Sequence, residues 1–289
     1  MPFVFTLEVK VLGTTMIGLP PGTRALIVNA DDFGSRQSTN TAIKLGLRDG
    51  ILSSTSLMVP CPWAFDAMAW LREHPEVTFA VHLTLVRDFD SYRWGPVAGR
   101  DAVASLVDAN GHFPKFEGVR RTPEHMRLDD IEREFRAQIE TVFSEGLVPT
   151  NLDWHCLPDG GSEEVFDLTL RLAREYGLTL RVHTNDHRAR CKVASLPTAD
   201  HPILDSYSIP SATKLTQFRD LLRTLPPGIT EWAIHPGADT PESRAVEPDS
   251  WQIRALDLEF VLSAVAHQIV ADEGIVLLSY RAVLPHWTA

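Results

Sequence analysis

Short apolar runs alternate with helical patterns along almost the whole of this 289-residue chain. The runs have the length of strands, and their near-continuous apolar character is expected when both faces of a sheet are covered. They predict strands over Ala25–Ala30, Thr55–Val59, Thr78–Leu85, Asn151–His155, Thr179–Val182, Glu231–His235 and Ile275–Ser279. Between the runs, apolar side chains recur at the spacing of a helix. This spacing predicts helices over Ser38–Arg48, Trp63–Glu73, Asp129–Ser144, Glu163–Tyr176, Ala212–Leu225 and Trp251–Asp272.

Strands that alternate with helices predict a parallel sheet in an α/β fold. We expect a (β/α) barrel of the TIM type with seven parallel strands, and a doubly wound open sheet is the alternative. A Rossmann dinucleotide site is disfavoured because no GxGxxG follows the first strand. Residues 24–289 show no second composition regime, so they are interpreted as one domain.

Residues 1–23 and two long connections stand outside this alternation. Near the start, Phe5, Leu7, Val9 and Val11 alternate with polar residues, which predicts an N-terminal arm or edge strand without the features of a signal peptide. Segments 86–123 and 184–208 are too long for simple connections. Long connections in compact domains often carry function, and the first is expected to wall a binding cleft.

Composition and charge argue against several classes of function. The net charge of −11 disfavours a nucleic-acid partner, because phosphates need a positive surface. No apolar run is long enough to span a membrane. The three cysteines, Cys61, Cys156 and Cys191, lack CxxC spacing, which favours free thiols in a reducing cytoplasm.

The most unusual local feature is a pair of aspartates, Asp31 and Asp32, directly after the first strand. Ionised carboxylates at the end of a buried strand are costly unless they are paired or bound to a cation. Three histidines, His82, His155 and His235, stand at or near the ends of other predicted strands. The carboxyl ends of barrel strands converge on one face, where active sites are built. The sequence therefore predicts that these five side chains meet.

Two imidazoles and one carboxylate are a suitable set for a divalent cation, with positions left open for water. A second carboxylate could take a proton from water, and a further histidine could protonate a leaving group. Together these are the parts of a metal-assisted hydrolase acting on an amide or ester. Each part also has a structural interpretation: the aspartates could cap the next helix, a histidine could be hydrogen-bonded core, and His235-Pro236-Gly237 could be a turn.

Several motifs give the chain a specific resemblance to a known family. They are Asn29-Ala30-Asp31-Asp32-Phe33-Gly34, Ser53–Met58, Val81-His82-Leu83-Thr84-Leu85, Thr230-Glu231 and His235-Pro236-Gly237, with Asn40, Gly50, Glu134, Gln138 and Arg254 in matching places. In these, the sequence resembles the YdjC-like carbohydrate deacetylases over about residues 24–282, and its layout is similar to that of NodB-type polysaccharide deacetylases.

The resemblance implies a distorted (β/α) barrel that hydrolyses N-acetyl groups of acetylated amino sugars or oligosaccharides with one divalent metal ion. It implies Asp32, His82 and His155 as metal ligands, Asp31 as the base and His235 as the acid. It also implies Arg254, Glu231 and Asp153 as substrate-binding or supporting groups. Zinc or magnesium suits such a ligand set, and manganese and cobalt stay open.

The stretch Asp153-Trp154-His155-Cys156-Leu157 departs from the family pattern, which has a second histidine where Leu157 stands. Strand alternation would place Asp153, His155 and Leu157 on one face and turn Cys156 away. Cys156 is therefore disfavoured as a soft metal ligand.

Two other functions stay open at this stage. The same site could act as an amidase or esterase on a non-sugar acyl group, or the barrel could bind sugar without catalysis. Trp94 and Trp251 are candidate sugar-stacking side chains, or else core residues. The expected partner is a small carbohydrate, and a homodimer is left open.

Overall fold

The computed structural model describes residues 13–287 and contains one sheet of eight parallel strands. The seven predicted strands are all present. The strands are β1 (Arg24–Phe33), β2 (Ser54–Leu57), β3 (Phe79–Leu83), β4 (Asn151–Trp154), β5 (Thr179–Leu180), β6 (Leu204–Asp205), β7 (Gly228–Ile234) and β8 (Val276–Leu278). The expected strand over residues 5–11 lies outside the described residues.

The strand order is β5-β4-β3-β2-β1-β7-β6, and β8 pairs with the first half of β1. From β1 to β5 the order follows the chain without reversing, which is the order of a barrel and not of a doubly wound sheet. Within residues 13–287 no ladder joins β5 to β6, so the barrel is open on that side. The predicted distorted barrel is thus confirmed, and the doubly wound alternative is wrong.

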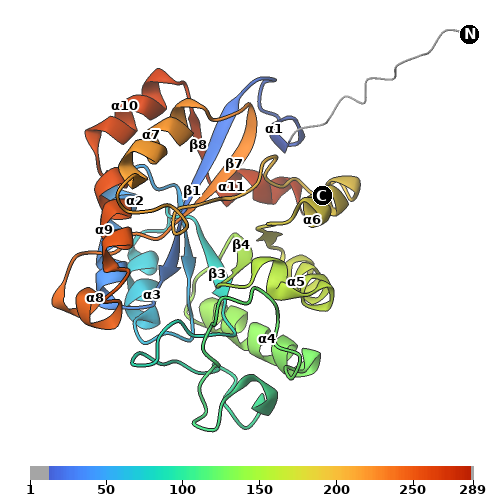
Figure 1. The fold of residues 1–289 in the computed structure, drawn as a ribbon. Coiled ribbons are helices and arrows are strands. Elements are labelled where there is room, and N and C mark those ends of the chain that lie inside the picture. Colours follow the sequence, from blue (N-terminus) through green and yellow to red (C-terminus); the bar gives the residue numbers. More distant parts are fainter. Residues whose placement is uncertain (1–12, 288–289) are drawn as a thin grey trace, which may run out of the picture.

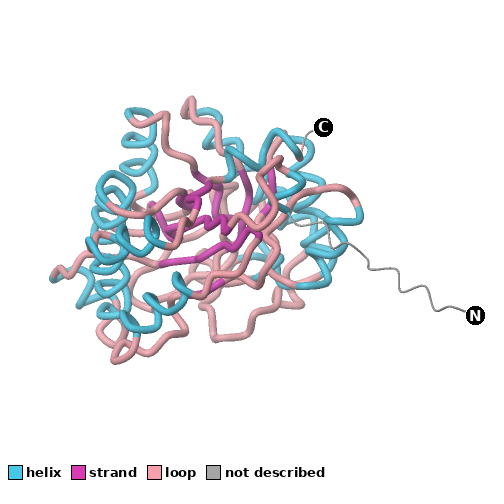
Figure 2. Tube along the Cα trace, turned by 90° about the horizontal axis from the view of Figure 1, so that it is seen from above, coloured by secondary structure: helices cyan, strands magenta, loops and turns pink. Residues whose placement is uncertain are grey.

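Helices surround this sheet (Figures 1 and 2). In Figure 1, α2, α3 and α9 lie on one flank and α4 and α5 on the other. The helices are α1 (Gly13–Met16), α2 (Gln37–Asp49), α3 (Ala64–Glu73), α4 (Leu128–Ser144), α5 (Glu163–Tyr176), α6 (Asn185–Val193), α7 (Lys214–Arg223), α8 (Pro241–Val246), α9 (Trp251–Val261), α10 (Ala264–Asp272) and α11 (Tyr280–Val283).

Capping explains where the sequence prediction succeeds and where it fails. Helix α5 has the predicted bounds because the Ser162 hydroxyl accepts from the Val165 N–H and Gly177 ends the helix with a φ of 68°. The single helix expected over Trp251–Asp272 is wrong. Ser263 caps a new helix by accepting from the Ala266 N–H, so the segment divides into α9 and α10.

The long segment between β3 and α4 has a small core of its own. Trp94, Val103, Leu106 and Phe113 are all buried. The Trp94 indole donates to the Val86 carbonyl at 3.0 Å. A loop with buried apolar side chains and paired backbone groups has a defined conformation, so it can present side chains to a cleft.

Glu134 and Gln138, on the buried face of α4, hold the interior and the start of this segment. The Glu134 carboxylate accepts from the backbone N–H groups of Val97 and Ala98 at 3.0 and 2.9 Å. The Gln138 amide accepts from the Thr84 N–H at 3.0 Å and donates to the Thr84 carbonyl at 2.8 Å. Burial raises the pKa of Glu134 to about 7, although its hydrogen bonds act in the opposite direction.

None of the helices within residues 13–287 combines the length and the apolar character that crossing a bilayer requires.

We predict that Glu134→Ala lowers the free energy of unfolding by about 1–2 kcal/mol at pH 5, because it leaves two half-buried N–H groups without an acceptor. The pKa of Glu134 is raised in the folded state, so its stabilising contribution is complete below its ordinary pKa and declines as pH rises through 7. The loss should therefore be smaller at pH 8. Urea unfolding at both pH values measures it.

The matched control is Glu140→Ala on the exposed side of the same helix, where the Glu140 carboxylate accepts from the Tyr176 hydroxyl. It should change stability by no more than about 0.5 kcal/mol. Equal losses in the two variants would contradict the anchoring role of Glu134.

Candidate active site

The end of strand β1 is irregular, and the two carboxylates of Asp31 and Asp32 lie there, at the carboxyl edge of the sheet. The register of β1 with β2 shifts between Ala30 and Phe33, and Asp32 has a left-handed φ of 72°. Bulges of this kind redirect side chains at strand ends. Asp31 and Asp32 are both buried and have different neighbours. They do not cap the following helix, whose N-cap position is Arg36.

Asp32 lies among the two histidines that the sequence assigned to the same cluster. Its Oδ1 is 3.2 Å from the Nδ1 of His155 and 3.7 Å from the Nε2 of His82. The three side chains each offer one ligand atom, all within 4.8 Å of one another. Metal–ligand bonds of about 2.0–2.2 Å place neighbouring ligand atoms about 3–3.5 Å apart. The donor set therefore fits a single divalent cation.

The ring of His82 is oriented from behind by Asp153, whose Oδ1 contacts the His82 Nδ1 at 2.8 Å. Ser56 holds the other oxygen of Asp153 at 2.5 Å. The proton therefore belongs on Nδ1 and the lone pair on Nε2, which faces Asp32. Carboxylate–histidine pairs of this kind are the usual support of metal-binding imidazoles. This is a further observation in favour of a cation site.

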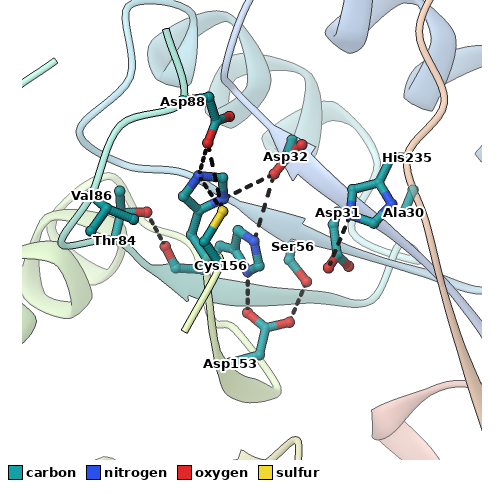
Figure 3. A network of polar contacts seen from close by, with 12 residues as sticks. Ala30, Asp31, Asp32, Ser56, Thr84, Val86, Asp88, Asp153, Cys156 and His235 are labelled. Atoms are coloured by element: carbon teal, nitrogen blue, oxygen red, sulfur yellow. Dashed lines mark hydrogen bonds and ion pairs between the residues drawn. The ribbon is translucent and has the colours of Figure 1, made fainter. Parts of the chain in front are cut away.

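His155 is oriented by Asp88, a residue of the long segment after β3. Asp88 Oδ1 lies 2.8 Å from the His155 Nε2, opposite the nitrogen that faces Asp32 (Figure 3). Burial alone would lower the pKa of His155, but the Asp88 and Asp32 carboxylates raise it well above its ordinary value. Two carboxylates thus converge on one imidazole, which is a concentration of negative charge that suits a cation.

The second oxygen of Asp32 is held by Arg254, as expected of a supporting group. The Arg254 Nη2 donates to Asp32 Oδ2 at 2.7 Å, and its Nε donates to Glu247. Glu247 also pairs with Arg36 at 2.8 Å. Burial would raise the pKa of Asp32, yet Arg254 and the histidines hold it well below its ordinary range. Asp32 is consequently an ionised carboxylate with one oxygen free of arginine.

Asp31 is held by a different arginine, which sequence reasoning missed. Arg181 donates to both oxygens of Asp31 at 2.9 Å, and its Nε donates to Glu231 at 2.6 Å. The Asn29 amide also donates to Asp31. Burial would raise the pKa of Asp31, but Arg181 above all lowers it well below its usual range. An arginine within the apolar strand pattern Thr179–Val182 was the signal that could have indicated it.

His235 faces Asp31 from the end of β7, with its Nε2 3.9 Å from Asp31 Oδ2. On the other side of the ring, Nδ1 lies 3.1 Å from the Ser206 hydroxyl. That hydroxyl donates to Asp257 at 2.6 Å, so it accepts from the imidazole. Asp257, paired with Lys214 at 2.7 Å, is fully buried. Neither Ser206 nor Asp257 was identified from the sequence, because β6 and the buried face of α9 show no distinct local pattern.

The expectation that strand alternation places Leu157 on the face of His155 and turns Cys156 away is wrong. Strand β4 ends at Trp154, and Cys156 has a left-handed φ of 59°, so strand alternation does not extend to these residues. The Cys156 thiol lies 3.4 Å from the His155 Nε2 and lines the pocket. Leu157 is buried and is not part of the pocket lining.

A pocket of about 360 Å³ opens over these residues. It exposes Asp31, Asp32, His82, His155, His235 and Arg254. Both long segments contribute walls, which include Phe89, Phe116 and Arg120 from the first and Asp205 and Tyr207 from the second. Arg120 lies 3.7 Å from Asp205, so the two walls are in contact.

The two tryptophans considered for sugar stacking are not in the pocket lining. Trp94 is a core residue whose ring edge packs near His155, with 6.2 Å between ring centroids. Trp251 carries the guanidinium of Arg244 on its ring. Phe89, Phe116, Trp154 and Tyr207 are the aromatic side chains that line the pocket.

Comparison with known proteins identifies a matching family and several similar chains. The sequence pattern of the family described as "YdjC-like protein" matches residues 25–272. A carbohydrate deacetylase of Geobacillus stearothermophilus is 34% identical over 266 residues, covering 89% of this chain and 97% of its own. A carbohydrate deacetylase of Thermoanaerobacter pseudethanolicus is 30% identical over 256 residues, covering 88% and 97%. The crystal structure of a candidate cellobiose-phosphate cleavage protein of Enterococcus faecalis V583 has 25% identity and a TM-score of 0.75, covering 90% and 98%.

We predict that Arg181→Met raises the pKa of Asp31, because burial then acts without its main opposing charge. In the native protein Asp31 stabilises the fold above its ordinary pKa, and that contribution is lost only as pH falls through the depressed value. Removal of Arg181 should therefore cost stability at neutral pH, by about 3–5 kcal/mol for a broken buried pair. Carboxyl ¹³C NMR titration of Asp31 and urea unfolding measure the two effects.

The milder Arg181→Lys should shift the pKa of Asp31 in the same direction if the methionine variant does not fold. The control is Arg171→Met, which removes a half-exposed partner of Glu132 on the protein surface. An unchanged Asp31 pKa in both Arg181 variants would contradict the assignment.

Proposed function

Since this chain belongs to the YdjC-like protein family, we propose that it is a metal-dependent hydrolase that removes N-acetyl groups from acetylated amino sugars. Two relatives that match nearly over their full length bear the name carbohydrate deacetylase, which supports a carbohydrate as substrate. The observation that carries the proposal is the separation of the two aspartates. Asp32 lies with two imidazoles, whereas Asp31 lies with Arg181 and His235.

In this proposal, Asp32 Oδ1, His82 Nε2 and His155 Nδ1 hold one divalent cation. The cation would polarise the amide carbonyl and make bound water more acidic. Asp153 and Asp88 keep the two imidazoles in the tautomers that the site needs. Arg254 holds the second oxygen of Asp32 and so leaves a single oxygen for the cation.

Asp31 is the proposed general base. Arg181 keeps its carboxylate ionised, so Asp31 is ready to accept a proton from the attacking water. The arginine makes Asp31 a weak base, which is sufficient only for water that is already acidified. Glu231 accepts from the Arg181 Nε and so holds Arg181 in place. The Tyr280 hydroxyl donates to the other oxygen of Glu231 at 2.5 Å. Glu231 is therefore proposed as a supporting residue that does not touch the substrate.

His235 is the proposed general acid. Its Nδ1 donates to Ser206, which in turn donates to Asp257, so its orientation is set by the second wall of the pocket. Its Nε2 is then the nitrogen that faces Asp31 and the substrate space. From there it can give a proton to the departing amine nitrogen when the C–N bond breaks.

The walls of the pocket support a sugar as the substrate. Apolar C–H faces of a pyranose ring pack well on aromatic rings, and Phe89, Phe116 and Tyr207 offer such faces. Asp205 and Arg120 at the same walls offer acceptors and donors for hydroxyl groups. A pocket of about 360 Å³ suits one sugar residue rather than a long buried chain.

We predict that the purified protein binds about one divalent cation per chain and releases acetate from short N-acetylglucosamine oligomers. Chelation should abolish the release, and adding back zinc, magnesium, manganese or cobalt should restore it to differing degrees. Elemental analysis and an acetate assay measure the two properties. A metal-loaded protein that releases acetate only from non-sugar amides or esters would favour an amidase or esterase instead.

Two variants test the proposed roles of Asp31 as the base and of the set that contains Asp32 and His82 as the metal ligands. Asp31→Asn should retain the cation and lose activity by at least about 10²-fold, the usual contribution of a general base. His82→Ala should lose the cation as well as the activity. Loss of cation in Asp31→Asn would mean that the roles of Asp31 and Asp32 are reversed, and full occupancy in His82→Ala would exclude His82 as a ligand.

A further inference from the structure

Cys156 occupies a position that the proposed reaction does not use. The left-handed backbone at this residue places its thiol in the pocket, 3.4 Å from the His155 Nε2 and 3.6 Å from Asp88 Oδ1. Asp88 Oδ1 is itself 2.8 Å from the same imidazole nitrogen. A sulfur, a nitrogen and an oxygen atom therefore converge on one point beside the cluster of Asp32, His82 and His155 (Figure 3).

These three atoms have the spacing and the chemistry of a metal site. Their mutual distances lie between 2.8 and 3.6 Å, comparable to the separations of neighbouring ligands around a bound ion. A thiolate together with an imidazole favours soft or borderline cations over magnesium or calcium. We propose that Asp88, His155 and Cys156 form a second cation site, selective for strongly thiophilic divalent ions such as cadmium.

The second site competes with the first because both need His155. A neutral imidazole carries one proton and offers one lone pair, so only one of its two nitrogens can bind a cation. Binding at Asp32 and His82 uses Nδ1 and leaves the proton on Nε2, where Asp88 accepts it. Binding at Asp88 and Cys156 uses Nε2 and moves that proton to Nδ1. The Cys156 thiol loses its own proton to solvent, and no electrons are transferred.

The consequence is a sensitivity to the type of metal. A hard ion gains nothing from the thiolate and stays at Asp32, His82 and His155. A thiophilic ion in excess over the hard ion withdraws His155 from the first site, and the first site then loses one of its three ligands. This inference concerns ligand chemistry alone and does not depend on which acyl substrate the protein hydrolyses.

Cadmium titration of the metal-free protein tests the second site, because cadmium–thiolate bonds give an ultraviolet charge-transfer band. The wild-type protein should develop the band up to one ion per chain, and magnesium chloride should give none. Cys156→Ser should lose the band. Asp32→Asn, which weakens only the first site, should keep it and reach it at lower cadmium concentration.

The other two cysteines provide matched controls. Cys61→Ser and Cys191→Ser remove buried thiols outside the cluster and should leave the band unchanged. A wild-type protein without the band, or a band that survives in Cys156→Ser and disappears in Cys61→Ser, would overturn the proposal. These outcomes are separate from acetate release, since failure of the deacetylase assay would leave the cadmium band as it is.

Discussion

The compensation of two adjacent buried carboxylates is the constraint on which the rest of this site depends. Asp31 and Asp32 lie near the end of a buried strand, and ionised carboxylates there are strongly unfavourable without opposite charge. Arg181 meets the first and Arg254 the second. Each arginine is buried in turn and needs a further acid, Glu231 in one case and Glu247 in the other.

These pairs connect elements that are distant in the sequence. Arg181 follows β5 and Arg254 belongs to α9, so one end of the strand order and one outer helix are bound to the end of β1. Asp31 and Arg181 are 150 residues apart, and Asp32 and Arg254 are 222 apart. Because the arginines approach from different sides, the two carboxylates acquire different surroundings although they are neighbours in the chain. The proposed division of roles, with Asp32 as a cation ligand and Asp31 as a general base, depends on this asymmetry.

The residue types of the site could be identified from the sequence because polar groups at the ends of apolar strands are conspicuous. Asp31, Asp32, His82, His155 and His235 were found in this way and lie together around one pocket. Their supports were harder to find. Asp88 lies in a long connection without periodicity, and Asp257 lies within the apolar pattern of a helix, where one carboxylate gives no local signal of its partner.

By itself, the sequence determined the alternation of strands and helices, the parallel α/β class and the chemical groups at the strand ends, because these follow from local periodicity and from the cost of burying charge. The strand order of the structure then distinguished the barrel from a doubly wound sheet. Only the tertiary structure decided which acid each arginine neutralises, which nitrogen of each imidazole is free and where the Cys156 thiol points. The physical reason is that such choices depend on contacts across the sheet and on a left-handed turn after β4 that ends strand alternation. No pattern within a few residues of sequence contains that information.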